Sequence, residues 1–286
     1  MQLWTEPTLG SFLRHLDGTR HAWIWDPYQP YQSSIEASWN GMASLETALE
    51  QAKTLRGLED TLHQIQALRT DLVPQIRAPQ TLRRIPVAHA SKGILNPHRV
   101  LRGSTKPYQT RAARLIPQHG KLVHIVLPGS FHAGVSNDEI LLASVASVTL
   151  ADLLQAAGYI VTVSIAAISL GLLPAQAKRG DMQDTCTVVG LRANNAAWSL
   201  HTLAVATQPT FLRRLMFRYW ESMAPQYGTL ASGYGQTINE QDRFLSRVQG
   251  VLGTDPVLIG AGQWDHITTP ALAAAWIQAQ LAHVTA

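Results

Sequence analysis

Hydrophobic positions in the first quarter of the chain recur with a helical period. Apolar residues are spaced three or four apart across 45–55, and the same spacing resumes across 58–68 after Gly57. Ser44 is suited to cap the first of these stretches, and Pro74 ends the second. The pattern predicts two amphipathic helices, or one helix with a kink at the glycine.

In the second half of the chain, short β-branched runs alternate with helical stretches. A strand is expected at 124–127, followed by a loop at 128–136, a long apolar helix and a second strand at 159–165. Ser136 and Glu139 have the spacing of a capping box, which satisfies free backbone N–H groups at a helix start. The segment therefore predicts a βαβ unit.

The same alternation continues to the end of the chain. Strands are expected at 185–191 and 256–260, and helices at about 196–206, 210–223, 242–252 and 269–281. Strands that alternate with helices indicate a mainly parallel sheet with helices on both faces. We predict an α/β fold, a three-layer and mainly parallel sheet, for a domain of residues 121–286.

Residues 1–120 are predicted to form an N-terminal extension with three parts. Residues 1–38 form an aromatic-rich arm, part of which Pro27 and Pro30 are expected to keep extended, and the helical pair follows. Residues 74–120 contain six prolines, spaced too closely for long helices. Short strands or ordered loops that wrap another domain fit this last part better.

Charge divides the chain in a different way. The whole chain of 286 residues has a net charge of +4, but residues 72–137 hold ten Lys and Arg and no acid. Such a block is an electrostatic footprint for phosphate or for an acidic protein surface. Pairing of these cations with acids elsewhere in the fold remains an open alternative. The candidate basic patch comprises Arg77, Arg83, Arg84, Lys92, Arg99, Arg102, Lys106, Arg111 and Arg114.

The loop at 128–136 matches no nucleotide-binding motif, since it has neither a GxGxxG pattern nor the Gly-Lys-Ser/Thr ending of a P-loop. An α/β-hydrolase start is a second reading, with Asp265 and His266 as acid and base. That fold needs a Gly-x-Ser-x-Gly motif, which the chain lacks. The sequence around Ser232 is the most similar to it. Ser130, His132, Trp264, Asp265 and His266 therefore remain candidates for a partner-facing loop, with no catalytic residue predicted.

A third reading compares the loop with the metal site of a von Willebrand factor A-like domain. There a strand ends in Asp-x-Ser-x-Ser, whose side chains bind Mg²⁺. Aligning Ser130 with the first serine puts Pro128 in place of the aspartate and His132 in place of the second serine. A hard divalent cation requires carboxylate oxygen. The site is therefore expected to be degenerate, with no metal and no cofactor.

Several other residues are expected to be structural. Trp198, Trp220 and Trp276 are predicted to lie in the core, and Cys186, the only cysteine, is predicted to be a buried hydrophobic residue. Arg213 and Arg214 are interpreted as the solvated or salt-bridged edge of a helix, with an anion site as the alternative.

Five blocks of sequence, in their order, resemble an uncharacterised family of proteins from bacteria and their phages. Its C-terminal half is von Willebrand factor A-like. The blocks are 39–49, 100–107, 156–161, 207–217 and 233–235, with Gln208 where the family has histidine. The resemblance implies that fold and a phage or mobile-element source, and it implies no activity.

Together these features predict a non-enzymatic interaction or assembly protein. Its partner is expected to be a protein or, through residues 72–137, nucleic acid. A serine hydrolase and a virion structural subunit are the alternatives. No apolar run reaches the length of a membrane span and the first residues do not form a signal peptide, so a cytoplasmic location without membrane contact is expected.

Overall fold

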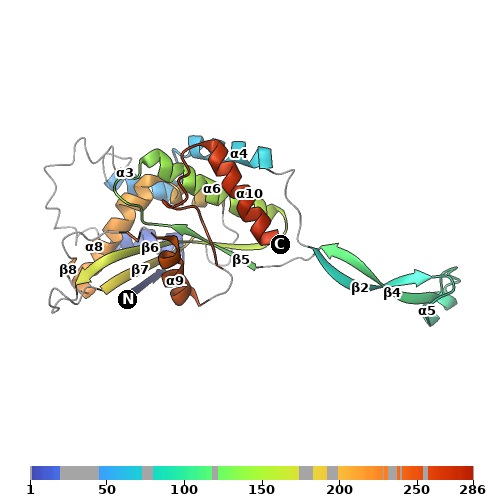
Figure 1. Cartoon of the computed structure of the whole chain (residues 1–286). Coiled ribbons are helices and arrows are strands. Elements are labelled where there is room, and N and C mark those ends of the chain that lie inside the picture. Colours follow the sequence, from blue (N-terminus) through green and yellow to red (C-terminus); the bar gives the residue numbers. More distant parts are fainter. Residues whose placement is uncertain are drawn as a thin grey trace.

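The computed structural model describes most of the chain. The described residues are 2–19, 45–72, 80–117, 122–173, 183–191, 199–227, 229–230, 237–238, 240–253 and 257–285. They form a body of sheet and helices, from which one long hairpin projects (Figure 1).

The body is built on a six-stranded sheet. Its strands are β1 (Gln2–Glu6), β7 (Gln183–Gly190), β6 (Ile160–Leu173), β5 (Leu122–Pro128) and β9 (Val257–Ile259) in spatial order, with β8 (Thr229–Leu230) beside β6. Pairs β1–β7, β5–β6 and β5–β9 are parallel, whereas β6–β7 and β6–β8 are antiparallel. The predicted α/β class and mainly parallel sheet are confirmed.

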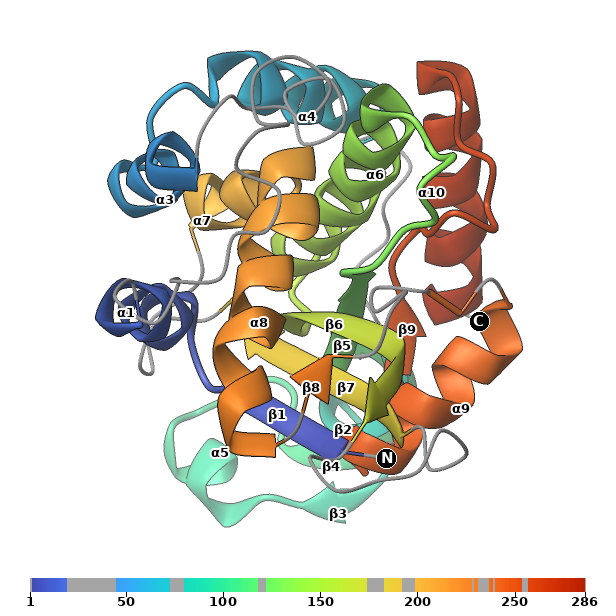
Figure 2. The ribbon, with the colours of Figure 1, turned by 90° about the vertical axis from the view of Figure 1, so that its left-hand side faces the viewer.

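Both faces of the sheet are buried, because alternate residues of its strands enter two separate cores. Ile125 and Ile165 join the first core, and Val126 and Ile168 join the second. Near-continuous apolar runs are typical of strands covered on both sides. The second core is closed by α9 (Gln241–Leu252), which lies apart from the other helices (Figure 2).

The first core is closed by most of the helices. They are α1 (Leu9–Gly18), α3 (Leu45–Thr54), α4 (Glu59–Leu72), α6 (Asn137–Ala156), α7 (Leu200–Ala206), the π-helical turn η4 (Phe211–Leu215), α8 (Met216–Tyr227) and α10 (Pro270–Thr285). The predicted pair of helices is α3 and α4, and the predicted capping box starts α6. Trp220 and Cys186 are fully buried, as predicted, and burial raises the pKa of the Cys186 thiol to about 12. Trp276 is half-buried, and Trp198 lies outside the described residues.

The start of the chain is part of this body. Strand β1 pairs with β7, and Trp4 enters the first core with Phe12 and Leu16 of α1. The described part of 1–38 is thus a strand and a capped helix, and the extended arm predicted around Pro27 and Pro30 lies outside the described residues. The boundary at residue 120 stays a prediction, and the rest of the aromatic segment lies outside the described residues.

The basic, proline-containing segment forms the projecting hairpin. Strands β2 (Gln80–His89) and β4 (Tyr108–Pro117) pair antiparallel over their full length, and β3 (Ile94–Leu95) adds to β4 near the tip. The short helix α5 (Pro97–Leu101) completes the tip. The strands are longer than predicted, and they extend away from the body and do not wrap it (Figure 1). Most of the ribbon has only two strands, so each strand has a free edge, and a free edge tolerates proline.

Helix α6 bears on the expected absence of a membrane span. By length and hydropathy its 20 residues could cross a membrane, but 67% of the apolar window is buried inside the protein. Helices α4 and α10 pack against it. Helix α6 is thus buried as a core helix is, and a core helix needs apolar residues on nearly every side.

Candidate functional site

The loop that follows β5 begins at Gly129, which lies close against β6. Gly129 N donates to Ala166 O at 2.7 Å, and a Cβ on this residue would lie 2.5 Å from Ile165 Cγ2. Only glycine fits so close to β6. At the other end of the loop, Ser136 Oγ accepts from Glu139 N, and the Glu139 carboxylate accepts from Ser136 N. The hydrogen bonds that the carboxylate accepts from Ser136 N and Ser136 Oγ, with a smaller contribution from His266, lower the pKa of Glu139.

The two candidate residues of this loop have different environments. Ser130 is buried, and its hydroxyl accepts a long hydrogen bond of 3.4 Å from Ile168 N. His132 is exposed, and its Nδ1 accepts from Gly134 N at 3.0 Å. Within the described part of the chain, no histidine shares a hydrogen bond with Ser130. The pair that a serine hydrolase would need is therefore not assembled here. Ser232 lies outside the described residues.

A buried arginine holds the loop in place. Arg213 of η4 donates to Asn137 Oδ1 at 2.9 Å, to His132 O at 3.2 Å and to Val135 O. Burial lowers the pKa of Arg213 to about 10, so the guanidinium stays charged at neutral pH. The expected solvated edge is wrong for Arg213, which is only 4% exposed. Its fork of donors satisfies loop carbonyls that have no partner in a strand.

The second candidate segment, 264–266, lies beside this loop. The two are joined by Gln263, whose side-chain oxygen accepts from His132 N. Asp265 accepts from Gly262 N at 2.8 Å and from Trp276 Nε1 at 3.1 Å, while burial raises its pKa. Trp264 packs against Phe244 at 5.3 Å between ring centroids. Both Asp265 and Trp264 thus have structural contacts, and His266 remains exposed with a left-handed φ of 49°.

This edge of the sheet therefore offers little chemistry. The predicted residues do meet, with Ser130, His132 and 264–266 brought to the carboxyl ends of β5 and β9. Among the residues that the structure describes, however, no three His, Cys, Asp or Glu side chains gather as metal ligands would. Their polar groups serve to join two loops. Gln263, which joins them, was not singled out in the sequence, and Arg213 was not expected to hold the first loop, because a long-range contact leaves no local pattern in a sequence.

The basic candidates lie on the hairpin. Arg83 and Arg84 lie on β2, and Arg114 on β4 is the ladder partner of Arg83. Farther along, Lys92, Arg102, Lys106 and Arg111 are exposed and Arg99 is half-buried. In the described structure none of these last five forms an ion pair. For them the alternative of pairing within the fold finds no support. Arg77 lies outside the described residues.

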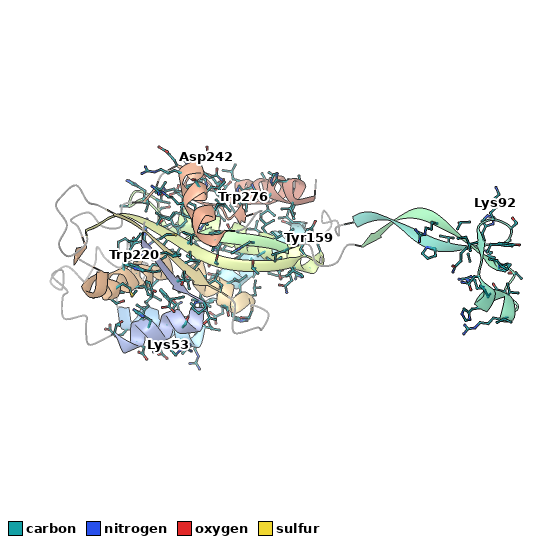
Figure 3. All side chains as sticks on the ribbon, turned by 90° about the horizontal axis from the view of Figure 1, so that it is seen from below. Lys53, Lys92, Tyr159, Trp220, Asp242 and Trp276 are labelled. Carbon is teal, nitrogen blue, oxygen red and sulfur yellow. The ribbon has the colours of Figure 1, made fainter. Side chains whose placement is uncertain are left out.

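The hairpin tip combines this charge with exposed apolar side chains. Four aliphatic residues there are between 46% and 84% exposed, namely Ile94, Leu95, Val100 and Leu101. Figure 3 shows Lys92 at the same tip, far from the labelled residues of the body. Gly93 makes the turn with a φ of 113°, and a Cβ there would lie 2.0 Å from Gln109 O. The sequence analysis identified the charge of this segment and missed the apolar residues.

Replacing Arg213 with methionine should lower the free energy of unfolding by about 2–4 kcal/mol. The change removes three charge-assisted hydrogen bonds and leaves the loop oxygens with fewer donors. Urea unfolding measures the loss. The control is Arg56→Met, since Arg56 is exposed. Equal and small losses in the two variants would contradict the clamp.

Comparison with known proteins gives one match. A family model described as a domain of unknown function, DUF7192, matches residues 5–266. No curated protein and no solved structure matches the chain. The match includes the end of β1, the helices of the first core except α10, the hairpin and the loop at 261–266. The chain therefore belongs to the DUF7192 family, whose function is unknown.

Proposed function

We propose that this protein is a non-enzymatic interaction or assembly protein whose hairpin binds an acidic partner, either a protein surface or nucleic acid. The observation that carries the proposal is the shape and charge of residues 80–117. They form an arm outside the body, with eight Lys and Arg and no Asp or Glu.

The distribution of charge supports binding through the arm. Outside the hairpin the chain has 15 Lys and Arg against all 19 Asp and Glu, a net charge of −4, whereas the hairpin has +8. An isolated two-stranded hairpin is marginally stable in water. Binding to an anionic surface would offset this cost.

Two finer assignments belong to the same proposal. The body is a three-layer, von Willebrand factor A-like domain with a degenerate metal site. Support comes from the βαβ unit of β5, α6 and β6, and from Pro128 at the end of β5. A phage or mobile-element source rests on the five resembling blocks of sequence.

A salt titration tests the proposal. Binding of the whole chain to duplex DNA, RNA and polyglutamate is measured as salt is raised from about 50 mM, where charge interactions reach farthest. Log affinity should fall linearly with log salt for at least one of the three. The variant K92Q/R102Q/K106Q should reduce this slope by about one for each charge removed.

The matched control removes three exposed cations of the body, R14Q/R56Q/R243Q, for the same change in net charge. It should bind almost as the wild type does. If none of the three polymers binds at low salt, or if both triple variants weaken binding equally, the arm is not the binding element.

A further inference from the structure

The far end of the hairpin is broader than a two-stranded ribbon. Residues 90–107, here called the tip lobe, contain β3 and α5 between the ends of β2 and β4. The lobe has the four exposed aliphatic residues on it, together with Lys92, Arg99, Arg102 and Lys106. Exposed apolar side chains beside polar and charged ones are typical of a surface that binds a protein.

The lobe cannot reach the body of its own chain. Ten residues of β-strand extend about 33 Å at the usual rise per residue. Figures 1 and 3 show the lobe at the outer end of this ribbon, pointing away from the sheet and the helices. Among the described residues, nothing from the body covers these aliphatic side chains, so they are available to another molecule.

The shape of the lobe disfavours a nucleic-acid groove as the receiving surface. The major groove, about 12 Å wide, admits one helix or a two-stranded ribbon. At the lobe, β3 adds a third strand beside the ends of β2 and β4, and α5 adds a helical turn, which together are broader than that. Its sequence also lacks Phe, Tyr and Trp, on which unpaired bases would stack.

The body carries a surface of the opposite charge. Helices α3 and α4 lie on the outside of the helical layer (Figure 2) and expose Glu46, Glu50, Glu59 and Asp60. Within the described structure none of these four carboxylates takes part in an ion pair. The cations Lys53 and Arg69 on the same helices pair with Asp17 and Asp152, which belong to α1 and α6. We call the four carboxylates the acidic face.

We propose that the tip lobe of one copy docks on the acidic face of a second copy. This inference rests on the proposed function, since it names the acidic partner of the arm as another copy of the chain. The lobe and the face are different patches, so the contact is head-to-tail and generates an open chain or a ring. The cations of the lobe contact the carboxylates of α3 and α4, and the aliphatic residues exclude water from the contact.

A complementary charge swap in the full-length chain tests the proposal. The arm variant is K92E/R102E/K106E, and the face variant is E46K/E50K/E59K. Mass photometry and sedimentation measure assembly over a range of protein and salt concentrations. Wild type should assemble at low salt and dissociate as salt is raised. Each variant alone should stay monomeric, because its arm and face then have the same sign.

Mixing the two variants should restore assembly, since the acidic arm of one fits the basic face of the other. The variant I94S/L101S should weaken assembly of the otherwise native chain by at least about tenfold, because it removes the most exposed apolar contacts. A wild type that stays monomeric at low salt overturns the proposal. Mixed variants that stay monomeric, or an I94S/L101S chain that assembles as wild type does, overturn it as well.

The polyanion titration separates this outcome from a failure of the proposed function. The face variant keeps a native arm and should bind the acidic polymers at least as tightly as wild type does. A monomeric wild type that still binds polyglutamate or DNA would sink the self-assembly inference and leave the binding arm in place. Loss of both would remove the arm as an interaction element.

Discussion

A chain in which residues 81–116 are replaced by Asn-Gly should remain folded and lose its binding to acidic polymers. Gln80 and Pro117 are partners in the β2–β4 ladder, so the ends of the excised segment are already adjacent. A two-residue Asn-Gly turn suits such an antiparallel pair. Between Pro86 and Ala112 the hairpin contributes no buried side chain. The free energy of unfolding should therefore change by less than about 1 kcal/mol.

Two measurements keep loss of binding apart from damage to the body. Urea unfolding gives the free energy, and labelling of the Cys186 thiol reports whether the core has opened, because this side chain is fully buried. The single change Gly93→Val should also weaken binding to acidic polymers. It disrupts the turn of the tip without removing any charge. A shortened chain that binds acidic polymers with undiminished affinity would show that the body, not the arm, is the binding element.

Replacing Trp220 with alanine should lower the free energy of unfolding by about 3–5 kcal/mol, as for other large-to-small changes in a core. Trp220 is 1% exposed and packs against Phe217, and its Nε1 donates to Thr187 Oγ1 at 2.8 Å. The change thus opens a cavity between α8 and the sheet and also removes a buried hydrogen bond. Urea or thermal unfolding measures the loss.

The variant Thr187→Val separates the two contributions. It keeps the volume of the core and leaves the indole N–H without its acceptor, which should cost about 1–3 kcal/mol. Leu272→Ala is the surface control, because Leu272 is 47% exposed on α10. A Trp220→Ala chain as stable as this control would mean that α8 does not pack on β7 as described.

Local signals account for the elements that sequence analysis predicted well. The start of α6 depends on Ser136 and Glu139, three residues apart, and the break between α3 and α4 depends on Gly57, whose φ is 68°. Both features act within a few residues, so they can be identified in the sequence. Helix α1 has the same kind of signal, since Thr8 and Ser11 form its capping box. That signal was overlooked among the neighbouring aromatic residues.

Long-range contacts account for what could not be predicted. Strand β1 has five residues and is defined by its pairing with β7, about 180 residues later in the chain. The hairpin was obscured because prolines exclude helices but do not indicate which strands will pair. At the candidate site, sequence placed Ser130 and His132 on one loop. The distances from these two residues to histidines and acids depend on contacts between segments far apart in the sequence. Arg213 and Gln263 make such contacts with His132.

The length of the hairpin can change without altering the body. The hairpin begins at Gln80 and ends at Pro117, which are paired and therefore adjacent. Residues added between them displace only the tip. Two residues added to each strand would lengthen the ribbon by about 7 Å and keep every side chain on its original face. One residue added to each would turn the following side chains to the opposite face of the ribbon. Additions of two residue pairs would therefore move the tip farther from the body without changing the stability of the core.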